Sequence, residues 1–337
     1  MLSEQRLFVI YQCKNLGDSL LTIPLIKALL RHFENSSVLV VCKSQSIPIF
    51  DGLNDRVRVI KRPSSLGEWV SLSLNLLRSS TCTVFLPHTS MAGLVLAKLT
   101  RSRSIAPIPM THWLMGSVDI FCPVRLTSWR HTAEVNLDML RKIGVSIETC
   151  DKVIDPTGLL HRPLSSSLSL ENARYVLVHP GSRWLFKSPR YKFWETVIER
   201  LASCGYSVVV TGESEGAEGQ LCKDLGNLPS VTNLAGQTDL TGLTYTIKRA
   251  VGFIGVDTFS THLAAGLGVP GVVLFGPTSE LVWGPYGSNC KLKVITSNHS
   301  CRPCHVDGCG GGKLSECLED LDPAQVVASF RRQIELC

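Results

Sequence analysis

Short apolar runs alternate with helical segments along most of the chain, a pattern typical of repeated strand–helix units. Apolar runs bounded by turn residues predict strands at 7–11, 38–42, 57–60, 83–86, 175–179, 207–211 and 231–234. Helices are predicted at 19–32, 66–78, 90–99, 133–143, 192–203, 215–225, 240–249 and 323–336. Segment 251–277 adds a strand, a polar turn, a small-residue helix and another strand. The pattern predicts parallel, doubly wound α/β sheets.

Two domains are expected, because 337 residues exceed what one hydrophobic core usually supports. The stretch 155–170 is rich in Pro and Ser and has no periodic face, so it is the best linker candidate. We therefore predict Rossmann-like domains at 1–165 and 166–322, facing each other across a cleft. The last helix, within 323–337, is expected to pack back across their junction. The stretch 107–123 shows no clear period.

Composition narrows the class of protein. A hydrophobic content of 44% and a charged content of 18% indicate a packed globule and argue against a disordered chain. The net charge of +6 is either a solvated surface excess or an attraction to an acidic partner such as a nucleotide, a lipid phosphate or a membrane surface. No apolar run approaches the roughly 18 residues of a spanning helix. The first residues predict a strand rather than a signal peptide, so a cytoplasmic location is expected.

The 13 cysteines then have two readings. In a reducing compartment most of them, such as Cys42, Cys82 and Cys204, are expected to be small apolar core residues. Four others are closely spaced, at Cys301, Cys304, Cys309 and Cys317. These could hold zinc or, less in keeping with their spacing, an iron–sulfur cluster, or they could be free loop thiols.

The turn after the strand near residue 255 predicts an anion site. Asp257, Thr258 and Ser260 are good N-cap residues for the helix that follows. Such a helix start directs backbone N–H groups and partial positive charge at the carboxyl end of the sheet, where ligands of α/β proteins bind. His262 lies about one turn from Asp257, so both could face a phosphate or diphosphate; a packed or surface histidine is the alternative.

A second turn, Asn15 to Ser19, follows the first strand. Gly17 permits a tight turn with close backbone approach. Asp18 has two readings: a general base that takes a proton from an attacking hydroxyl, or a residue that caps the next helix.

Two further loops follow strands of the second half. His179 to Lys187 contains Ser182, Arg183 and Lys187, which could stabilise charge that develops on phosphates or could be ordinary surface residues. After the strand at 207–211, either Glu213 or Glu215 could accept hydrogen bonds from a ribose or cap a helix. The motifs GxxxxGK[ST], GxSxG and HExxH are absent, and no GxGxxG follows the first strand, so a kinase, serine hydrolase, zincin or dehydrogenase has no support.

Three segments carry a resemblance to a known family. NLGDSLLTIPLIKAL at 15–29, HPGSRWLFK at 179–187 and GVDTFSTHLAAGLGVPGVVLFGPTSE at 255–280 resemble the bacterial lipopolysaccharide heptosyltransferases, the GT-B enzymes of glycosyltransferase family nine. CRPCHVDGCGGGKLSECL at 301–318 is most similar to the heptosyltransferase III branch. Phe259 departs from the small residue that is usual at its position.

The resemblance implies an inverting transfer of heptose from ADP-L-glycero-D-manno-heptose to the lipopolysaccharide inner core on lipid A, with no metal or cofactor. It implies that the first half binds the acceptor and the second half the nucleotide sugar. Asp18 falls on the general base and Lys187 on the phosphate-binding lysine. Asp257, Thr258 and His262 fall on the donor loop. The adenine is expected near 237–239, including Thr238.

A lipid acceptor implies peripheral association with the inner face of the inner membrane, and no nucleic-acid partner is expected. We expect the membrane contact within 110–130, which contains Trp113, Arg125, Trp129 and Arg130. Two rival hypotheses remain open. One is a transferase of the same fold with another nucleotide sugar or acceptor, and the other is a non-catalytic ADP-sugar-binding protein.

Overall fold

The computed structural model describes residues 6–79, 82–109, 115–124, 129–162 and 174–336. The chain divides into two compact units, Met1–Gly158 and Leu159–Cys337. The domain boundary predicted at 165–166 lies outside the described residues.

The first unit contains one parallel sheet, in the order β3-β2-β1-β4-β5-β6 among its described residues. Its strands are β1 (Arg6–Gln12), β2 (Ser36–Cys42), β3 (Val57–Lys61), β4 (Cys82–Phe85), β5 (Arg103–Pro109) and β6 (Ile120–Val124). Its helices are α1 (Leu16–Leu20), α2 (Ile23–His32), α3 (Ile47–Phe50), α4 (Leu66–Leu77), α5 (Met91–Leu99) and α6 (Thr132–Arg141). The chain reverses its direction across the sheet between β1 and β4, which places the topological switch point there.

The second unit repeats this order, since its sheet runs β12-β11-β10-β7-β8-β9 over the described residues. The strands are β7 (Tyr175–His179), β8 (Ser207–Val210), β9 (Val231–Asn233), β10 (Gly252–Val256), β11 (Gly271–Leu274) and β12 (Leu292–Ile295). The helices are α7 (Tyr191–Ser203), α8 (Gly216–Leu225), α9 (Leu240–Arg249), α10 (Phe259–Gly266), α11 (Glu280–Trp283), α12 (Glu316–Glu319) and α13 (Pro323–Glu335). All strand pairs in both sheets are parallel, which confirms the predicted α/β class.

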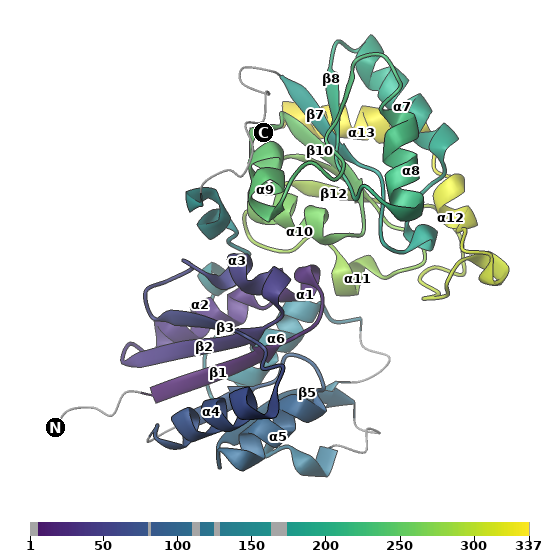
Figure 1. Cartoon of the computed structure of the whole chain (residues 1–337). Coiled ribbons are helices and arrows are strands. Elements are labelled where there is room, and N and C mark those ends of the chain that lie inside the picture. The colour runs from purple at the N-terminus through teal and green to yellow at the C-terminus, as the bar shows by residue number, and fades with distance from the viewer. Residues whose placement is uncertain (1–5, 80–81, 110–114, 125–128, 163–173, 337) are drawn as a thin grey trace. The chain divides into compact units, whose positions relative to one another are not determined.

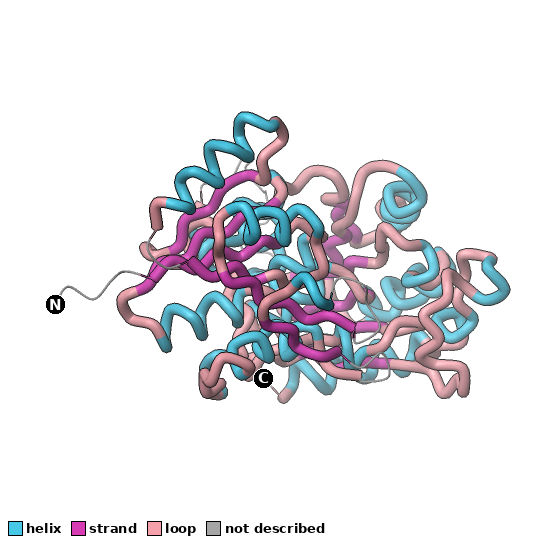
Figure 2. The backbone as a smooth tube through the Cα atoms, turned by 90° about the horizontal axis from the view of Figure 1, so that it is seen from below, coloured by secondary structure: helices cyan, strands magenta, loops and turns pink. Residues whose placement is uncertain are grey.

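Helices cover both faces of each sheet (Figure 1, Figure 2). Right-handed crossovers put helices on opposite faces when the chain winds in opposite directions. In the first unit, α4 and α5 pack into one core cluster over β1 and β4, and α2 packs against α6. In the second unit, α13 packs against α7 and against β10, β11 and β12.

The stretch 107–123, which shows no sequence period, takes part in two strands. Pro107 and Pro109 in β5 pair with β6, the edge strand. The pairing of β5 with β4 ends at Ile105, before the prolines begin. Because proline cannot donate to the ladder, this placement at the sheet edge is the one that tolerates it.

Two further differences concern local structure. The helix predicted at 19–32 is two helices, because α2 begins after Thr22 with Pro24 in its first turn. Cys42 is buried as expected, whereas Cys204 is exposed at the end of α7. No helix in the described parts of the chain combines the length and apolarity that crossing a bilayer requires.

Candidate active site

A buried carboxylate organises the carboxyl edge of the second sheet. Asp257 follows β10 directly and is 6% exposed. Its Oδ2 accepts hydrogen bonds from Lys187 Nζ at 2.6 Å and from the Thr278 hydroxyl at 2.7 Å. Lys187 comes from the loop after β7 and Thr278 from the loop after β11, so three strand ends converge here. Sequence reasoning found Lys187 and Asp257 but not Thr278.

The helix that starts beside Asp257 has no side-chain cap, contrary to the expectation from its cap residues. Thr258 is the N-cap of α10, but its side chain accepts no hydrogen bond from the first turn. Its hydroxyl lies 2.7 Å from that of Ser260, and the Thr261 hydroxyl donates to the Val256 carbonyl at 2.6 Å. No cap side chain accepts hydrogen bonds from the first N–H groups of α10. These N–H groups point towards the carboxyl edge of the sheet, as an anion site requires. His262 is buried within this helix.

The loop after β7 is shaped by close packing. Ser182 is buried and its hydroxyl accepts from the Trp184 N–H at 3.2 Å. Arg183 is exposed and its guanidinium lies 5.9 Å from the centre of the Trp184 ring. At Gly181 a side chain would overlap with that of Glu218, so this loop can lie against α8 only with glycine. The loop therefore brings Lys187 inward and leaves Arg183 outside.

Glu218 is a buried carboxylate that the sequence pattern did not single out. It accepts the Glu213 N–H at 3.2 Å, and its Oε1 lies 3.7 Å from His179 Nε2. Burial raises the pKa of the Glu218 carboxyl and lowers the pKa of His179 to about 4. The carboxylates that sequence reasoning named, Glu213 and Glu215, are both exposed. The available signal was the position of Glu218 in the first turn of the helix after β8, where a carboxylate faces the strand ends.

The segment expected to contact adenine lies before α9. Asp239 caps this helix by accepting the Gly242 N–H at 2.7 Å. Gln237 donates from its side chain to the Asn233 carbonyl at 2.9 Å. Thr238 lies between them and is partly buried. The side chains on either side of Thr238, those of Gln237 and Asp239, thus form hydrogen bonds that hold this segment and the start of α9.

Asp18 lies at the carboxyl edge of the first sheet, in the first turn of α1, close behind Gly17. Its Oδ2 accepts the Asn15 N–H at 3.3 Å, so it does contribute to capping. Burial raises the pKa of the carboxyl, while Lys14 and the hydrogen bond from Asn15 oppose that rise. Asp18 therefore contributes to the cap of α1 and places a carboxyl group of raised pKa at the carboxyl edge of the first sheet.

A basic hollow of about 410 Å³ adjoins this edge. It is lined by Lys43, Ser44, Lys61, Arg62, Pro63, Ser64 and Trp69. Lys43 follows β2, and Lys61 and Arg62 end and follow β3, so the three cations converge from neighbouring strand ends. None of them forms an ion pair with another described residue.

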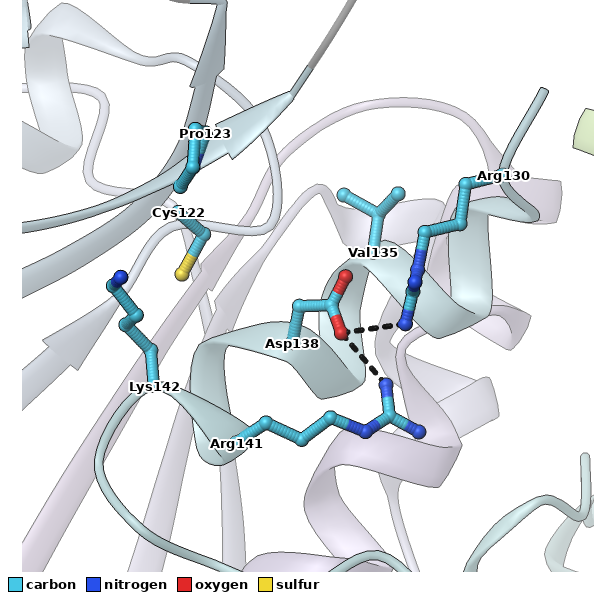
Figure 3. A pocket seen from close by; sticks show the side chains of 7 residues that line it. All are labelled: Cys122, Pro123, Arg130, Val135, Asp138, Arg141 and Lys142. Atoms are coloured by element: carbon cyan, nitrogen blue, oxygen red, sulfur yellow. Dashed lines mark hydrogen bonds and ion pairs between the residues drawn. The ribbon is translucent and has the colours of Figure 1, made fainter. Parts of the chain in front are cut away.

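A second hollow in the same unit, of about 290 Å³, offers a contrast. Figure 3 shows Arg130 and Arg141 both directed at Asp138, at 2.8 and 2.7 Å. Its two arginines thus form ion pairs with Asp138, whereas none is found for the cations of the basic hollow among the described residues, although Lys61 interacts with Glu68 at longer range. The basic hollow is the better site for an anionic ligand.

His88, after β4, completes this edge and was missed by sequence reasoning. Its Nδ1 is buried and has no hydrogen-bond partner among the described residues. Burial, together with the positive charge of Lys14 and Lys43, lowers its pKa to about 4. The imidazole is therefore neutral near pH 7.

The cysteine group lies between β12 and α13. Cys317 is buried, Cys301 is exposed, and Cys304 and Cys309 are partly buried. Within the described residues, no group of three or more Cys, His, Asp or Glu side chains is arranged to hold a metal ion. Burial raises the pKa of the Cys317 thiol to about 11.

Comparison with known proteins agrees with this geometry. The family model for glycosyltransferase family 9 (heptosyltransferase) matches residues 146–314. A lipopolysaccharide heptosyltransferase 3 of Escherichia coli is 25% identical over 295 residues, which cover 81% of this chain and 84% of that protein.

Two solved structures share the fold. A family 9 glycosyltransferase from Veillonella parvula has a TM-score of 0.77 at 17% identity, with 100% of this chain and 99% of that chain covered. An E. coli heptosyltransferase solved with ADP has a TM-score of 0.72 at 18% identity, with 97% and 99% covered. The paired parallel sheets are thus those of GT-B heptosyltransferases.

Proposed function

The chain belongs to glycosyltransferase family 9, the heptosyltransferases, and on that premise we propose that it moves L-glycero-D-manno-heptose from an ADP donor to the inner core of lipopolysaccharide. The observation that carries the proposal is the uncapped start of α10 beside the Lys187–Asp257 pair. A helix N-terminus is suited to a diphosphate, and Lys187, which Asp257 holds in place, can still donate to it from its other N–H bonds.

In this proposal the second unit binds the donor. The N–H groups of α10 and Lys187 hold the diphosphate, with Thr258, Ser260 and His262 around it. Glu218 accepts the ribose hydroxyls, since it is a buried carboxylate at this edge that does not pair with Lys187, while Glu213 and Glu215 stay at the rim. Ser182 supports the loop that carries Lys187, Arg183 stays at its outer side, and Thr238 lies towards the base.

The first unit supplies the base and holds the acceptor. Asp18 takes the proton of the attacking hydroxyl as that oxygen bonds to the anomeric carbon and the bond to ADP breaks with inversion. ADP leaves with the electron pair, and Lys187 and α10 balance its charge. A pKa raised by burial makes Asp18 a stronger base than an exposed aspartate. The basic hollow binds phosphates of the inner core.

An acceptor on lipid A also implies that the protein works at the inner face of the inner membrane. The net charge of +6 supports attraction to its anionic lipids. Of the residues expected at this contact, Trp113 and Arg125 lie outside the described residues. Trp129 is 48% exposed, and Arg130 already pairs with Asp138.

The test is an incubation with ADP-heptose and a series of truncated core acceptors, followed by mass spectrometry. We expect one acceptor to gain one heptose while ADP is released. Gain of mass from a different nucleotide sugar alone would support the rival transferase. Tight ADP binding with no product on any acceptor would support the non-catalytic binding protein.

A further inference from the structure

The helix α4 exposes a row of apolar side chains. Leu66, Val70, Leu74 and Leu77 are 81%, 49%, 51% and 45% exposed. Their spacing places them along one side of the helix, next to the buried positions Leu72 and Leu76. The apolar surface of α4 is therefore wider than the part that packs on the sheet.

The helix α5 goes further, because almost all of its outward face is apolar. Met91, Val95 and Leu99 are 51%, 48% and 57% exposed at successive turns. Lys98 is the one charged residue of this nine-residue helix. A water-facing helix surface usually carries several charges, so this face is unusual for a solvated surface.

The two rows belong to one surface. Both helices pack into the same core cluster on one face of the first sheet, and Figure 1 shows them together on that side. Seven of the fifteen large apolar side chains exposed among the described residues lie on these two helices. Such clustering marks an interaction site rather than scattered surface residues. We call these seven residues the α4–α5 apolar face.

Cations border this face. Arg78 follows α4, and Arg101 and Arg103 follow α5, all exposed. Lys98, in the last turn of α5, is also exposed but pairs with Asp119 at 3.2 Å. Lys61 and Arg62 precede α4 at its other end. The only carboxylate within the two helices is Glu68, which caps α4 by accepting the N–H groups of Ser64 and Ser65. An apolar surface with a basic rim matches the chemistry of an anionic bilayer surface.

We propose that the α4–α5 apolar face inserts into the headgroup region of a bilayer that contains anionic lipids. The basic rim, formed by Arg78, Arg101 and Arg103 with Lys61 and Arg62 at the other end of α4, contacts lipid phosphates. The inference rests on the proposed function, because a lipid-linked acceptor brings the enzyme to a membrane. It moves the expected contact from residues 110–130 to these two helices.

The test measures binding to vesicles by co-sedimentation. The probes are vesicles of phosphatidylethanolamine and phosphatidylglycerol in a 7:3 ratio, and vesicles of phosphatidylcholine alone. The double variant Val95→Gln/Leu99→Gln replaces two of the three exposed apolar residues of α5 without touching buried positions. The matched control is Val306→Gln/Leu336→Gln, which replaces one valine and one leucine that are 51% and 80% exposed in the second unit.

We expect the wild type and the control to bind the anionic vesicles, with weaker binding to phosphatidylcholine. The α5 variant should lose at least about tenfold in partition coefficient, since about 1.4 kcal/mol of lost apolar burial corresponds to that factor. Equal binding of the variant and the control would overturn the proposal. So would an α5 variant that changes a dimer into a monomer in sedimentation velocity and binds vesicles normally, because the face would then bind a second copy.

A second readout separates this inference from the proposed function. With a deacylated, water-soluble core acceptor, the α5 variant should transfer heptose as fast as the wild type. With the same acceptor on lipid in anionic vesicles, its rate should fall several-fold. Failure of the wild type on the soluble acceptor would count against the proposed function, whereas equal rates of the two proteins on the lipid acceptor would count against the docking face alone.

Discussion

The two sheets share one strand order, but their carboxyl edges are built in different ways. At the second edge the cation Lys187 is held by a buried carboxylate, and the helix start beside it has no side-chain cap. At the first edge Lys43, Lys61 and Arg62 lie around a hollow without ion-pair partners among the described residues, and Asp18 is partly buried beside them. The same topology thus provides a preorganised site in one unit and an open, charged one in the other.

This difference teaches that the fold sets where ligands bind, while the side chains at the strand ends set which ligands. A preorganised edge suits a ligand of fixed chemistry, such as a nucleoside diphosphate. An open edge with uncompensated cations suits a larger anionic ligand that brings its own phosphates. In the proposed function, the first edge supplies base chemistry and binds the acceptor, and the second edge stabilises the leaving group.

The largest expected effect comes from Asp18→Asn. Asparagine keeps an oxygen that can accept the Asn15 N–H, but it cannot take a proton. We expect the turnover number to fall at least about 100-fold, the range for loss of a general base. Binding of ADP, measured by calorimetry, should be unchanged because the donor edge lies in the other unit. If turnover persists, Asp18 serves only to cap α1 and another residue must be the base. His88 is the next candidate at that edge.

Lys187 should affect donor binding, whereas Asp18 should affect proton transfer. Lys187→Met removes a charge-assisted contact to phosphate, so we expect ADP binding to weaken about 10- to 100-fold. The variant also leaves Asp257 buried without its cation, which destabilises the unit. The double variant Lys187→Met/Asp257→Asn separates these effects, because it restores charge balance. Recovery of ADP affinity in the double variant would show that Lys187 serves only to pair Asp257.

Substitutions in the basic hollow should change the KM for the acceptor and leave the KM for the donor unchanged. In Lys61→Ala/Arg62→Ala, two cations that have no ion pairs with described residues are lost, so folding should be little affected. We expect the KM for a phosphorylated core acceptor to rise about tenfold, with the KM for ADP-heptose unchanged. The same measurement on a dephosphorylated acceptor should show almost no difference. Arg130→Ala, in the compensated hollow, is the control and should leave both KM values near wild type.

Much of the fold followed from the chain's periodicity, because buried parallel strands are continuous apolar runs. The prediction missed β5 and β6 where prolines interrupt that signal, and pairing with an edge strand is what allows those prolines. It also merged α1 and α2, since their apolar period continues through the break at Thr22. The local sequence pattern shows which face of an element is apolar. It does not show where two strands still pair when prolines interrupt their hydrogen bonds.

The candidate site was predictable where its residues follow a strand within one motif, as for Asp18, Lys187 and Asp257. It was not predictable where partners come from different strand ends. Thr278 lies 21 positions from Asp257 in the chain, yet its hydroxyl donates a hydrogen bond to Asp257 Oδ2. Glu218 and the cations of the basic hollow are likewise brought in by the sheet order. Such convergence is a tertiary property that a single motif does not contain.

The pH dependence of stability should reflect two histidines whose pKa is lowered, His88 at the first edge and His179 at the second. The pKa of His88 and that of His179 are lowered to about 4 by burial, from 6.5 for the free side chain. The folded protein therefore favours the neutral form. The stability that comes from keeping these histidines neutral is fully present above about pH 6.5 and is lost as the pH falls towards 4. Thermal unfolding between pH 7.5 and 5 measures the loss, and His88→Gln should reduce the loss in the first unit but not in the second.

The smallest effect is a gain of stability in Asp18→Asn, which would sharpen the contrast between the edges. Burial raises the pKa of this carboxyl, so its ionised form is disfavoured in the folded state. The resulting cost is present above the folded pKa and disappears as the pH falls below the unfolded value of about 4. We therefore expect the Tm at pH 7 to rise, and the rise to vanish when thermal unfolding is measured below about pH 4. Lys187→Met should lower the Tm instead, so opposite signs at the two edges would indicate that Asp18 is retained for chemistry and Lys187 for both chemistry and structure.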